Sequence, residues 1–215
     1  KAQKHFPDVI EWRADYTCYS DPEKTARTYT FILERAEEHP VIFTYRKKEE
    51  GGTSDITEQN RIEIIKHVIV NAKPDIVDIE YNSGEETVRE IVELAHANGV
   101  KVIVSWHSFS RTPWHDELIG MMRKHRETGA DIVKFATMPE SPQDPLQLLG
   151  ACSDFVIETK TPTIAVSLGE TGKMTRVCGG VFGSCMTFAS LASSGSAPGQ
   201  IDSEVLPSIF REIYN

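Results

Sequence analysis

Several features of other protein classes are missing from this 215-residue chain. No apolar run is longer than a strand, which argues against a transmembrane helix, and the N-terminal residues lack the apolar core of a signal peptide. Basic residues are in deficit: 23 Lys and Arg against 32 Asp and Glu give a net charge of −9, which argues against binding nucleic acid or anionic membranes. The four cysteines form no CxxC pair and show no zinc-type spacing, so we expect reduced thiols in a cytoplasmic protein.

Short apolar runs alternate with helical patterns along the whole chain. Strands alternating with helices predict βαβ units and a parallel sheet. No linker or low-complexity stretch interrupts the alternation, so we predict one domain over residues 1–215. The predicted strands cover residues 8–13, 41–46, 75–80, 102–107, 131–136, 163–168 and 184–189, and the predicted helices cover 25–39, 59–72, 85–98, 116–128, 143–155 and 203–214.

Each of the first six predicted strands has one apolar and one polar face. Helices cover both faces of a flat doubly wound sheet, so a single polar face does not fit that fold. It fits a barrel, in which helices cover the outside and the interior opens at the C-terminal rim of the strands. The polar face carries Glu11, Arg13, Thr44, Arg46, Asp78, Glu80, Ser105, His107, Lys134, Thr163 and Ser167.

The predicted strands are one short of a complete barrel. A TIM barrel has about 250 residues in eight units, roughly 31 per unit, so this chain accounts for about seven. We therefore predict an α/β fold of the (β/α)8 TIM barrel class, N-terminally incomplete, with the first β-strand and most of the first helix absent from the chain. The two open sheet edges of such a barrel would favour aggregation, unless something else supplies the missing unit.

Lys134 is the most informative residue, because it interrupts a predicted buried strand. One interpretation is a structural ion pair with Glu11, Asp78 or Glu80. The other is chemical: a neutral lysine attacks a carbonyl to form an imine, and His107 at the end of the preceding strand moves protons.

Further candidates follow the ends of the predicted strands. Glu50 precedes two glycines and is placed to hydrogen-bond His107, although a solvated turn is the simpler interpretation. Arg176 could bind a carboxylate bidentately or be a surface arginine. Ser196 and Gln200 flank a Pro-Gly turn that could act as a lid over a polar substrate. The glycines between residues 179 and 183 give a weak indication of a phosphate site.

Together these residues resemble type I 3-dehydroquinate dehydratase of the shikimate pathway, in order and approximate spacing over nearly the whole chain. The segments that carry the resemblance are Ile10-Glu11-Trp12-Arg13-Ala14-Asp15, Phe43-Thr44-Tyr45-Arg46 with Glu50-Gly51-Gly52, Asp78-Ile79-Glu80, Ser105-Trp106-His107-Ser108-Phe109 with Thr112-Pro113, Gly129-Ala130-Asp131-Ile132-Val133-Lys134, Met138-Pro139 and Ser196-Ala197-Pro198-Gly199-Gln200-Ile201.

The resemblance implies a (β/α)8 barrel, usually a homodimer, that uses no metal or organic cofactor. It implies a lyase that dehydrates 3-dehydroquinate to 3-dehydroshikimate through a lysine imine. By position, Lys134 is the Schiff-base lysine, His107 the proton-transfer group and Glu50 the carboxylate that orients it. Arg176 would bind the substrate carboxylate. The residues that would surround the substrate hydroxyls and ring are Glu11, Arg13, Arg46, Ser196 and Gln200.

Two other functions stay open on the sequence. The glycines near residue 180 would suit a Schiff-base aldolase acting on a sugar phosphate. The missing N-terminal unit would suit a non-catalytic dehydroquinate-binding module or a domain of a multifunctional pathway protein.

Overall fold

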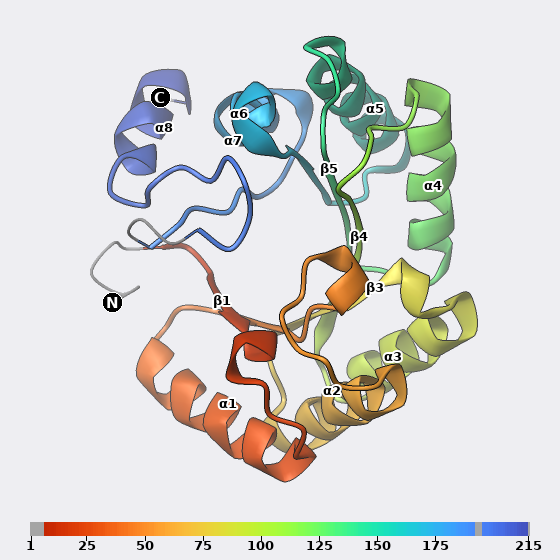
Figure 1. The fold of residues 1–215 in the computed structure, drawn as a ribbon, viewed down its shortest axis with the longest axis vertical. Helices are drawn as coiled ribbons and strands as arrows, with labels where there is room; N and C mark the ends of the chain where they lie inside the picture. Colours follow the sequence, from red (N-terminus) through yellow and green to blue (C-terminus); the bar gives the residue numbers. More distant parts are fainter. Residues whose placement is uncertain (1–6, 192–194, 215) are drawn as a thin grey trace. The chain divides into compact units, whose positions relative to one another are not determined.

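The computed structural model describes residues 7–191 and 195–214, which divide into two compact units (Figure 1). Of the described residues, the N-terminal unit contains 7–105 together with Glu127–Asp131. The C-terminal unit contains Trp106–Arg126 and the residues from Ile132 onward. The prediction of a single domain over residues 1–215 stays a prediction.

In the N-terminal unit, parallel strands alternate with helices. The register pairs Arg13 with Thr44, Thr44 with Asp78, and Glu80 with Ser105, so the predicted polar positions lie at the same level near the C-terminal ends of the strands. The strands are β1 (Ile10–Arg13), β2 (Val41–Thr44), β3 (Ile76–Glu80) and β4 (Lys101–Ser108), which belongs to this unit as far as Ser105. The helices are α1 (Pro22–Ala36), α2 (Glu58–Ala72) and α3 (Glu85–Ala97).

Local sequence explains where α1 begins and how it packs. Asp21 caps the helix by accepting from the backbone N–H of Glu23 at 2.9 Å, and proline occupies the first turn. Tyr29 is fully buried, and its hydroxyl donates to the Val41 carbonyl at 2.7 Å. Its ring packs edge-on against Phe43, so α1 is fixed to β2 by both apolar and polar contacts.

The C-terminal unit follows the same pattern. Its strands β5 and β6 are parallel, with Lys134 opposite Ile164 and Thr137 opposite Ser167. In the described residues, no helix is both long and apolar enough to span a lipid bilayer. The strands are β5 (Ile132–Thr137) and β6 (Thr163–Ser167), and the helices are α4 (His115–Glu127), α5 (Gln143–Thr159), α6 (Gly169–Gly172), α7 (Thr175–Cys178) and α8 (Leu206–Tyr214).

Six of the seven predicted strands are confirmed, as are all six predicted helices, with small differences in their ends. The strand predicted over residues 184–189 is wrong: only an isolated bridge between Ser184 and Thr163 forms there. The reason is the Ser184 side chain. Its Oγ accepts from the Ala165 N–H at 3.1 Å and lies 3.3 Å from the Met186 carbonyl, to which it donates, so a side chain replaces ladder hydrogen bonds.

Candidate active site

The nine predicted site residues are shared between the two units. The N-terminal unit holds Glu11, Arg13, Arg46 and Glu50, and the C-terminal unit holds His107, Lys134, Arg176, Ser196 and Gln200.

Arg46, which follows β2, is only 3% exposed and is surrounded by acceptors. Its Nη1 lies 3.0 Å from Asp78 Oδ1, 2.6 Å from Glu80 Oε1 and 2.8 Å from Ser105 Oγ, and its Nη2 lies 2.9 Å from Asp78 Oδ2. Burial alone would lower the pKa of Arg46, but the two carboxylates outweigh it and raise the pKa above its ordinary value. Arg46 therefore links β2, β3 and β4 through a buried ion-pair network.

The acidic residues on these strands bind other groups of the same unit. Glu80 also accepts from Arg61 Nη1 at 2.7 Å, and Arg61 donates to the Tyr45 carbonyl at 2.8 Å. Glu11 accepts from the Thr44 hydroxyl at 2.9 Å. Glu11, Asp78 and Glu80 were the candidate partners for a structural ion pair with Lys134. Each of them binds a group of the N-terminal unit.

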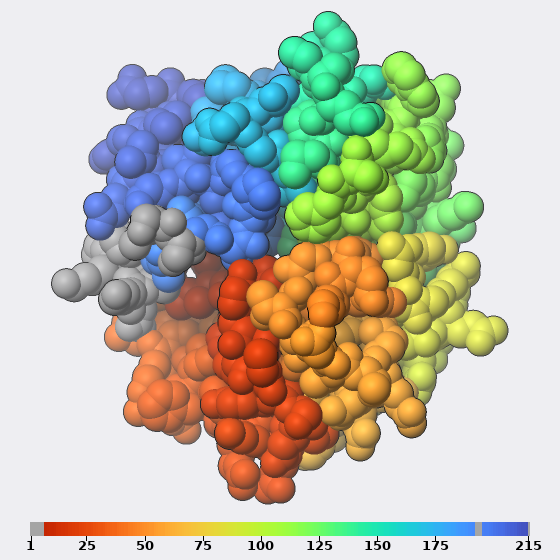
Figure 2. Space-filling view, in the orientation of Figure 1, coloured from red at the N-terminus to blue at the C-terminus, as the bar shows by residue number. Residues whose placement is uncertain are grey.

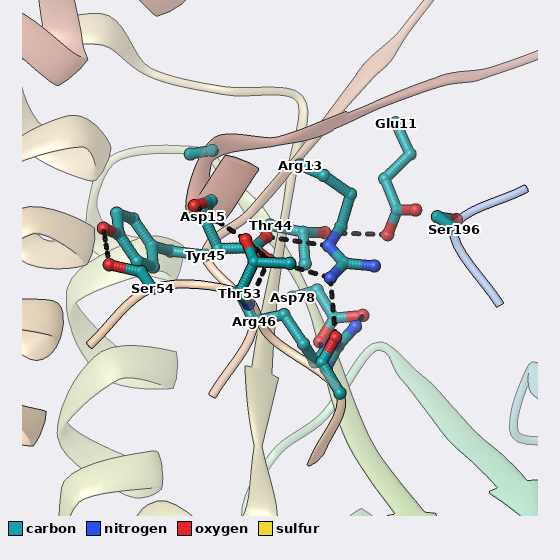
Figure 3. A network of polar contacts seen from close by, with 12 residues as sticks. Glu11, Arg13, Asp15, Thr44, Tyr45, Arg46, Thr53, Ser54, Asp78 and Ser196 are labelled. Atoms are coloured by element: carbon teal, nitrogen blue, oxygen red, sulfur yellow. Dashed lines mark hydrogen bonds and ion pairs between the residues drawn. The ribbon is translucent and has the colours of Figure 1, made fainter. Parts of the chain in front are cut away.

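Arg13, at the end of β1, forms a bidentate pair with Asp15 (Figure 3). Its Nε lies 2.8 Å from Asp15 Oδ1 and its Nη2 lies 2.8 Å from Asp15 Oδ2. Its Nη2 also donates to the Gly51 carbonyl at 3.1 Å. Within residues 7–191 and 195–214, Arg13 Nη1 has no hydrogen-bond acceptor, so one edge of a fixed guanidinium stays available for a ligand oxygen.

Glu50 ends a short 3-10 helix, η3 (Lys48–Glu50), in the loop after β2. Its side chain is 3% exposed, and its Oε1 accepts from Asn82 Nδ2 at 2.8 Å. The space-filling view shows this loop, in orange, beside the segment after β1, in red, on the surface of the N-terminal unit (Figure 2). Glu50 is therefore held in place, as a carboxylate with an orienting role requires.

In the C-terminal unit, Lys134 lies on β5 and is 6% exposed, which confirms the predicted buried lysine. Its Nζ lies 4.3 Å from the ring centroid of Phe188. His107, near the end of β4, is partly buried. A buried amine beside an aromatic face suits a lysine that forms a cationic imine, because the ring attracts the positive charge.

Arg176 lies on α7 and is 3% exposed, so the surface-arginine interpretation is wrong. Its Nη2 donates to the Pro198 carbonyl at 3.1 Å and its Nη1 to the Phe188 carbonyl at 3.4 Å. Among the described residues, its buried Nε has no acceptor. Burial lowers the pKa of Arg176 to about 10. Because its hydrogen bonds within residues 7–191 and 195–214 go to carbonyls, this buried guanidinium is a ready site for an anion.

Ser196 and Gln200 belong to one tight loop. Gln200 Oε1 accepts from the Ser196 N–H at 2.7 Å, and Gln200 Nε2 donates to Ser196 Oγ at 3.2 Å. Gly199 has a φ of +76°, and a Cβ there would lie 2.3 Å from the Gly169 carbonyl oxygen, so the loop packs closely against the start of α6. A pocket beside the loop is lined by Ser190, Gly195, Ser196, Ala197, Pro198, Gln200 and Asp202.

Three residues of these environments were missed on the sequence. Asp15 and Asn82 fix Arg13 and Glu50, and Phe188 faces Lys134. Asp15 lies two residues past the predicted strand end, where alternation no longer assigns a direction. Phe188 fell inside the strand that does not form, and no sequence signal singled out Asn82.

A family model described as type I 3-dehydroquinase matches residues 1–215. The chain belongs to this family. A 3-dehydroquinate dehydratase of Clostridium novyi (strain NT) is 36% identical over 97% of this chain and 83% of its own length.

Solved structures agree with the sequence comparison. The crystal structure of 3-dehydroquinate dehydratase from Geobacillus kaustophilus HTA426 matches with a TM-score of 0.92 and 33% identity, over 99% of this chain and 84% of that one. The type I enzyme from Clostridium difficile, with covalently modified comenic acid, matches with a TM-score of 0.90 and 34% identity, over 97% and 82% of the two chains. These matches confirm the predicted fold class.

Proposed function

We propose that this chain is a lyase that dehydrates 3-dehydroquinate to 3-dehydroshikimate through a Schiff base on Lys134. The observation that carries the proposal is a buried amine on Lys134 beside the Phe188 ring and, in the same unit, a buried guanidinium on Arg176 whose hydrogen bonds in the described residues go to backbone carbonyls. A ketone that also bears a carboxylate matches both groups. The family supports this substrate, and the covalently modified ligand in the Clostridium difficile structure supports covalent chemistry.

The proposed reaction begins when Lys134 Nζ attacks the ketone carbon and water leaves, which gives a protonated imine. Its nitrogen accepts the electron pair released when His107 removes the proton from the adjacent carbon. The resulting enamine expels the hydroxyl on the next carbon, and His107 returns its proton so that water leaves. Hydrolysis of the imine then releases the product and restores the Lys134 amine.

The other predicted residues take binding and orienting roles in this proposal. Arg176 binds the substrate carboxylate, because a new anionic acceptor would offset its buried charge. Arg13 offers its Nη1 to a substrate hydroxyl. The remaining assignments follow the family resemblance: Glu11, Arg46, Ser196 and Gln200 surround the hydroxyls and ring, and Glu50 orients His107. A cytoplasmic homodimer is proposed on the same resemblance.

The glycines that motivated an aldolase have a packing explanation. A Cβ at Gly180 would lie 2.8 Å from the Tyr214 hydroxyl, and one at Gly183 would lie 3.3 Å from Val156. Close packing against α8 and α5 therefore accounts for these glycines without a phosphate.

Reductive trapping tests the proposal. Borohydride added with 3-dehydroquinate should reduce the imine and leave a stable added mass on Lys134, located by peptide mass spectrometry. Lys134→Ala should abolish both the adduct and product formation. Lys101→Ala, which removes an exposed lysine of β4, should retain both. Binding of 3-dehydroquinate by the folded chain without adduct or product would instead support the non-catalytic module.

A further inference from the structure

Asp15 is a fully buried carboxylate outside the set of residues assigned to the reaction. It lies in η2 (Ala14–Thr17), directly after β1. Both carboxylate oxygens bind Arg13, at 2.8 Å each, so the pair is planar and fixed in direction. Asp15 therefore determines which edge of the Arg13 guanidinium stays available.

The same carboxylate also holds both ends of the loop that carries Glu50. Asp15 Oδ1 accepts from the Arg46 N–H at 3.4 Å, where the loop begins. Asp15 Oδ2 accepts from the Thr53 N–H at 3.1 Å, where it ends, and the Thr53 hydroxyl donates to the Asp15 carbonyl at 3.0 Å. Figure 3 shows these contacts converging on Asp15.

Between these two ends the loop has little freedom. The N–H groups of Glu50 and Gly52 both donate to the Lys47 carbonyl, at 3.0 and 2.9 Å. A Cβ at Gly52 would lie 2.1 Å from the Arg46 carbonyl oxygen. A movement of the loop ends would therefore be transmitted to Glu50 rather than absorbed within the turn.

We infer that Asp15 is a positioning residue for the dehydration: it sets the direction of Arg13 and the location of Glu50. The inference rests on the proposed function, because Arg13 and Glu50 have roles only in that reaction. In this inference Asp15 does not contact the substrate or His107. It acts through Arg13, which binds a substrate hydroxyl, and through Glu50, which orients His107.

The chemistry of the site requires a carboxylate. Oδ1 faces Arg13 Nε and the Arg46 N–H, and Oδ2 faces Arg13 Nη2 and the Thr53 N–H. Both oxygens thus face only donors. An asparagine would direct its NH2 group at donors in either amide orientation, and would leave the Arg13 charge without its partner.

A double-mutant cycle tests the inference. Displacing a catalytic group by about 1 Å can cost about 100-fold in rate, so Asp15→Asn should lower kcat by about 10- to 100-fold. In a Glu50→Gln background, where the orienting carboxylate is already lost, Asp15→Asn should lower kcat much less. Each kcat is divided by the fraction of molecules whose Lys134 is trapped by borohydride, so that unfolded molecules do not contribute.

The control is Asp75→Asn. Asp75 Oδ2 also accepts a hydrogen bond from a backbone N–H, that of Val41 at 2.9 Å, but this contact lies at the opposite end of β2 from the Glu50 loop. The kcat of this variant should be unchanged. Thr53→Val keeps the backbone and the Asp15–Arg13 pair but removes the hydroxyl that contacts the Asp15 carbonyl at 3.0 Å and Oδ2 at 3.3 Å. It should lower kcat by about 3- to 10-fold with the same dependence on Glu50. It serves as the test if Asp15→Asn does not fold.

The inference would be overturned if Asp15→Asn lowered kcat by the same factor in the wild-type and Glu50→Gln chains. A merely structural residue acts independently of Glu50. A wild-type chain that gives neither adduct nor product would overturn the proposed function, and the inference with it. An active wild type with additive effects would overturn the inference alone.

Discussion

Two arginines with the same exposure, 3%, have different surroundings. Arg46 contacts the carboxylates of Asp78 and Glu80, whereas Arg176 contacts only the carbonyls of Phe188 and Pro198 among the described residues. Burial lowers the pKa of Arg176 to about 10 from an ordinary value of 12.5. This shift corresponds to a cost on the order of 3 kcal/mol at neutral pH, because one pKa unit is about 1.4 kcal/mol. Arg176 is thus retained at a cost in stability that a bound carboxylate would offset.

Replacing Arg176 or Arg46 by methionine should therefore change the free energy of unfolding in different ways. Arg176→Met should leave the free energy of unfolding unchanged or raised and should increase KM at least 10-fold, since a lost charged hydrogen bond costs about 1.5–3 kcal/mol. Arg46→Met should lower the free energy of unfolding by about 3–5 kcal/mol, because it removes the Arg46 charge from two buried carboxylates. Urea titrations and steady-state kinetics measure both. Marked destabilisation by Arg176→Met would contradict an arginine reserved for substrate.

At the scale of elements, the loop after β2 depends on close backbone approach, whereas α4 does not. A Cβ at Gly52 would lie 2.1 Å from the Arg46 carbonyl oxygen, while one at Gly120 in α4 would meet no atom within 4 Å. Gly52→Ala should therefore displace the loop, lower kcat at least 10-fold and lower the free energy of unfolding by about 1–3 kcal/mol. Gly120→Ala, the same chemical change within a helix, should raise the free energy of unfolding by about 0.5–1 kcal/mol with unchanged kcat. Unchanged kcat in Gly52→Ala would show that the loop position does not affect catalysis.

The elements also show what the sequence could predict. Alternating patterns located β1 to β6, because burial of one face imposes a period of two residues. The same reasoning predicted a strand after Gly183 and could not foresee that the Ser184 side chain would take the place of a backbone group. Lys134 was found because a charge stands out in an apolar strand. Asn82 was missed because its role depends on Glu50, 32 positions away. Asp15 pairs with the nearby Arg13, but its hold on the loop depends on contacts 31 and 38 positions away.

At the scale of the whole molecule, the chain passes between the two units more than once, so neither unit is a continuous segment. β4 belongs to the N-terminal unit as far as Ser105, which pairs with Glu80, while its Ser108 carbonyl accepts from the Met138 N–H at 2.8 Å in the C-terminal unit. Asp131, which precedes β5, hydrogen-bonds Val102 of β4 through its backbone N–H at 3.0 Å and its side chain at 2.8 Å. Loss of either unit would therefore remove partners from β4.

We accordingly predict a single cooperative unfolding transition, as one domain over residues 1–215 requires. Trp12 reports on the N-terminal unit, where its ring centroid lies 5.7 Å from that of Phe43. Trp106 reports on the C-terminal unit, where its ring centroid lies 5.6 Å from that of Phe135. Variants that keep only one of these tryptophans, with the others replaced by phenylalanine, would be unfolded in urea and followed by fluorescence. After correction for the small stability change of each variant, measured by circular dichroism on the same samples, the two midpoints should coincide. Two separated midpoints would show that the units unfold independently, because β4 can lose one set of partners while it retains the other.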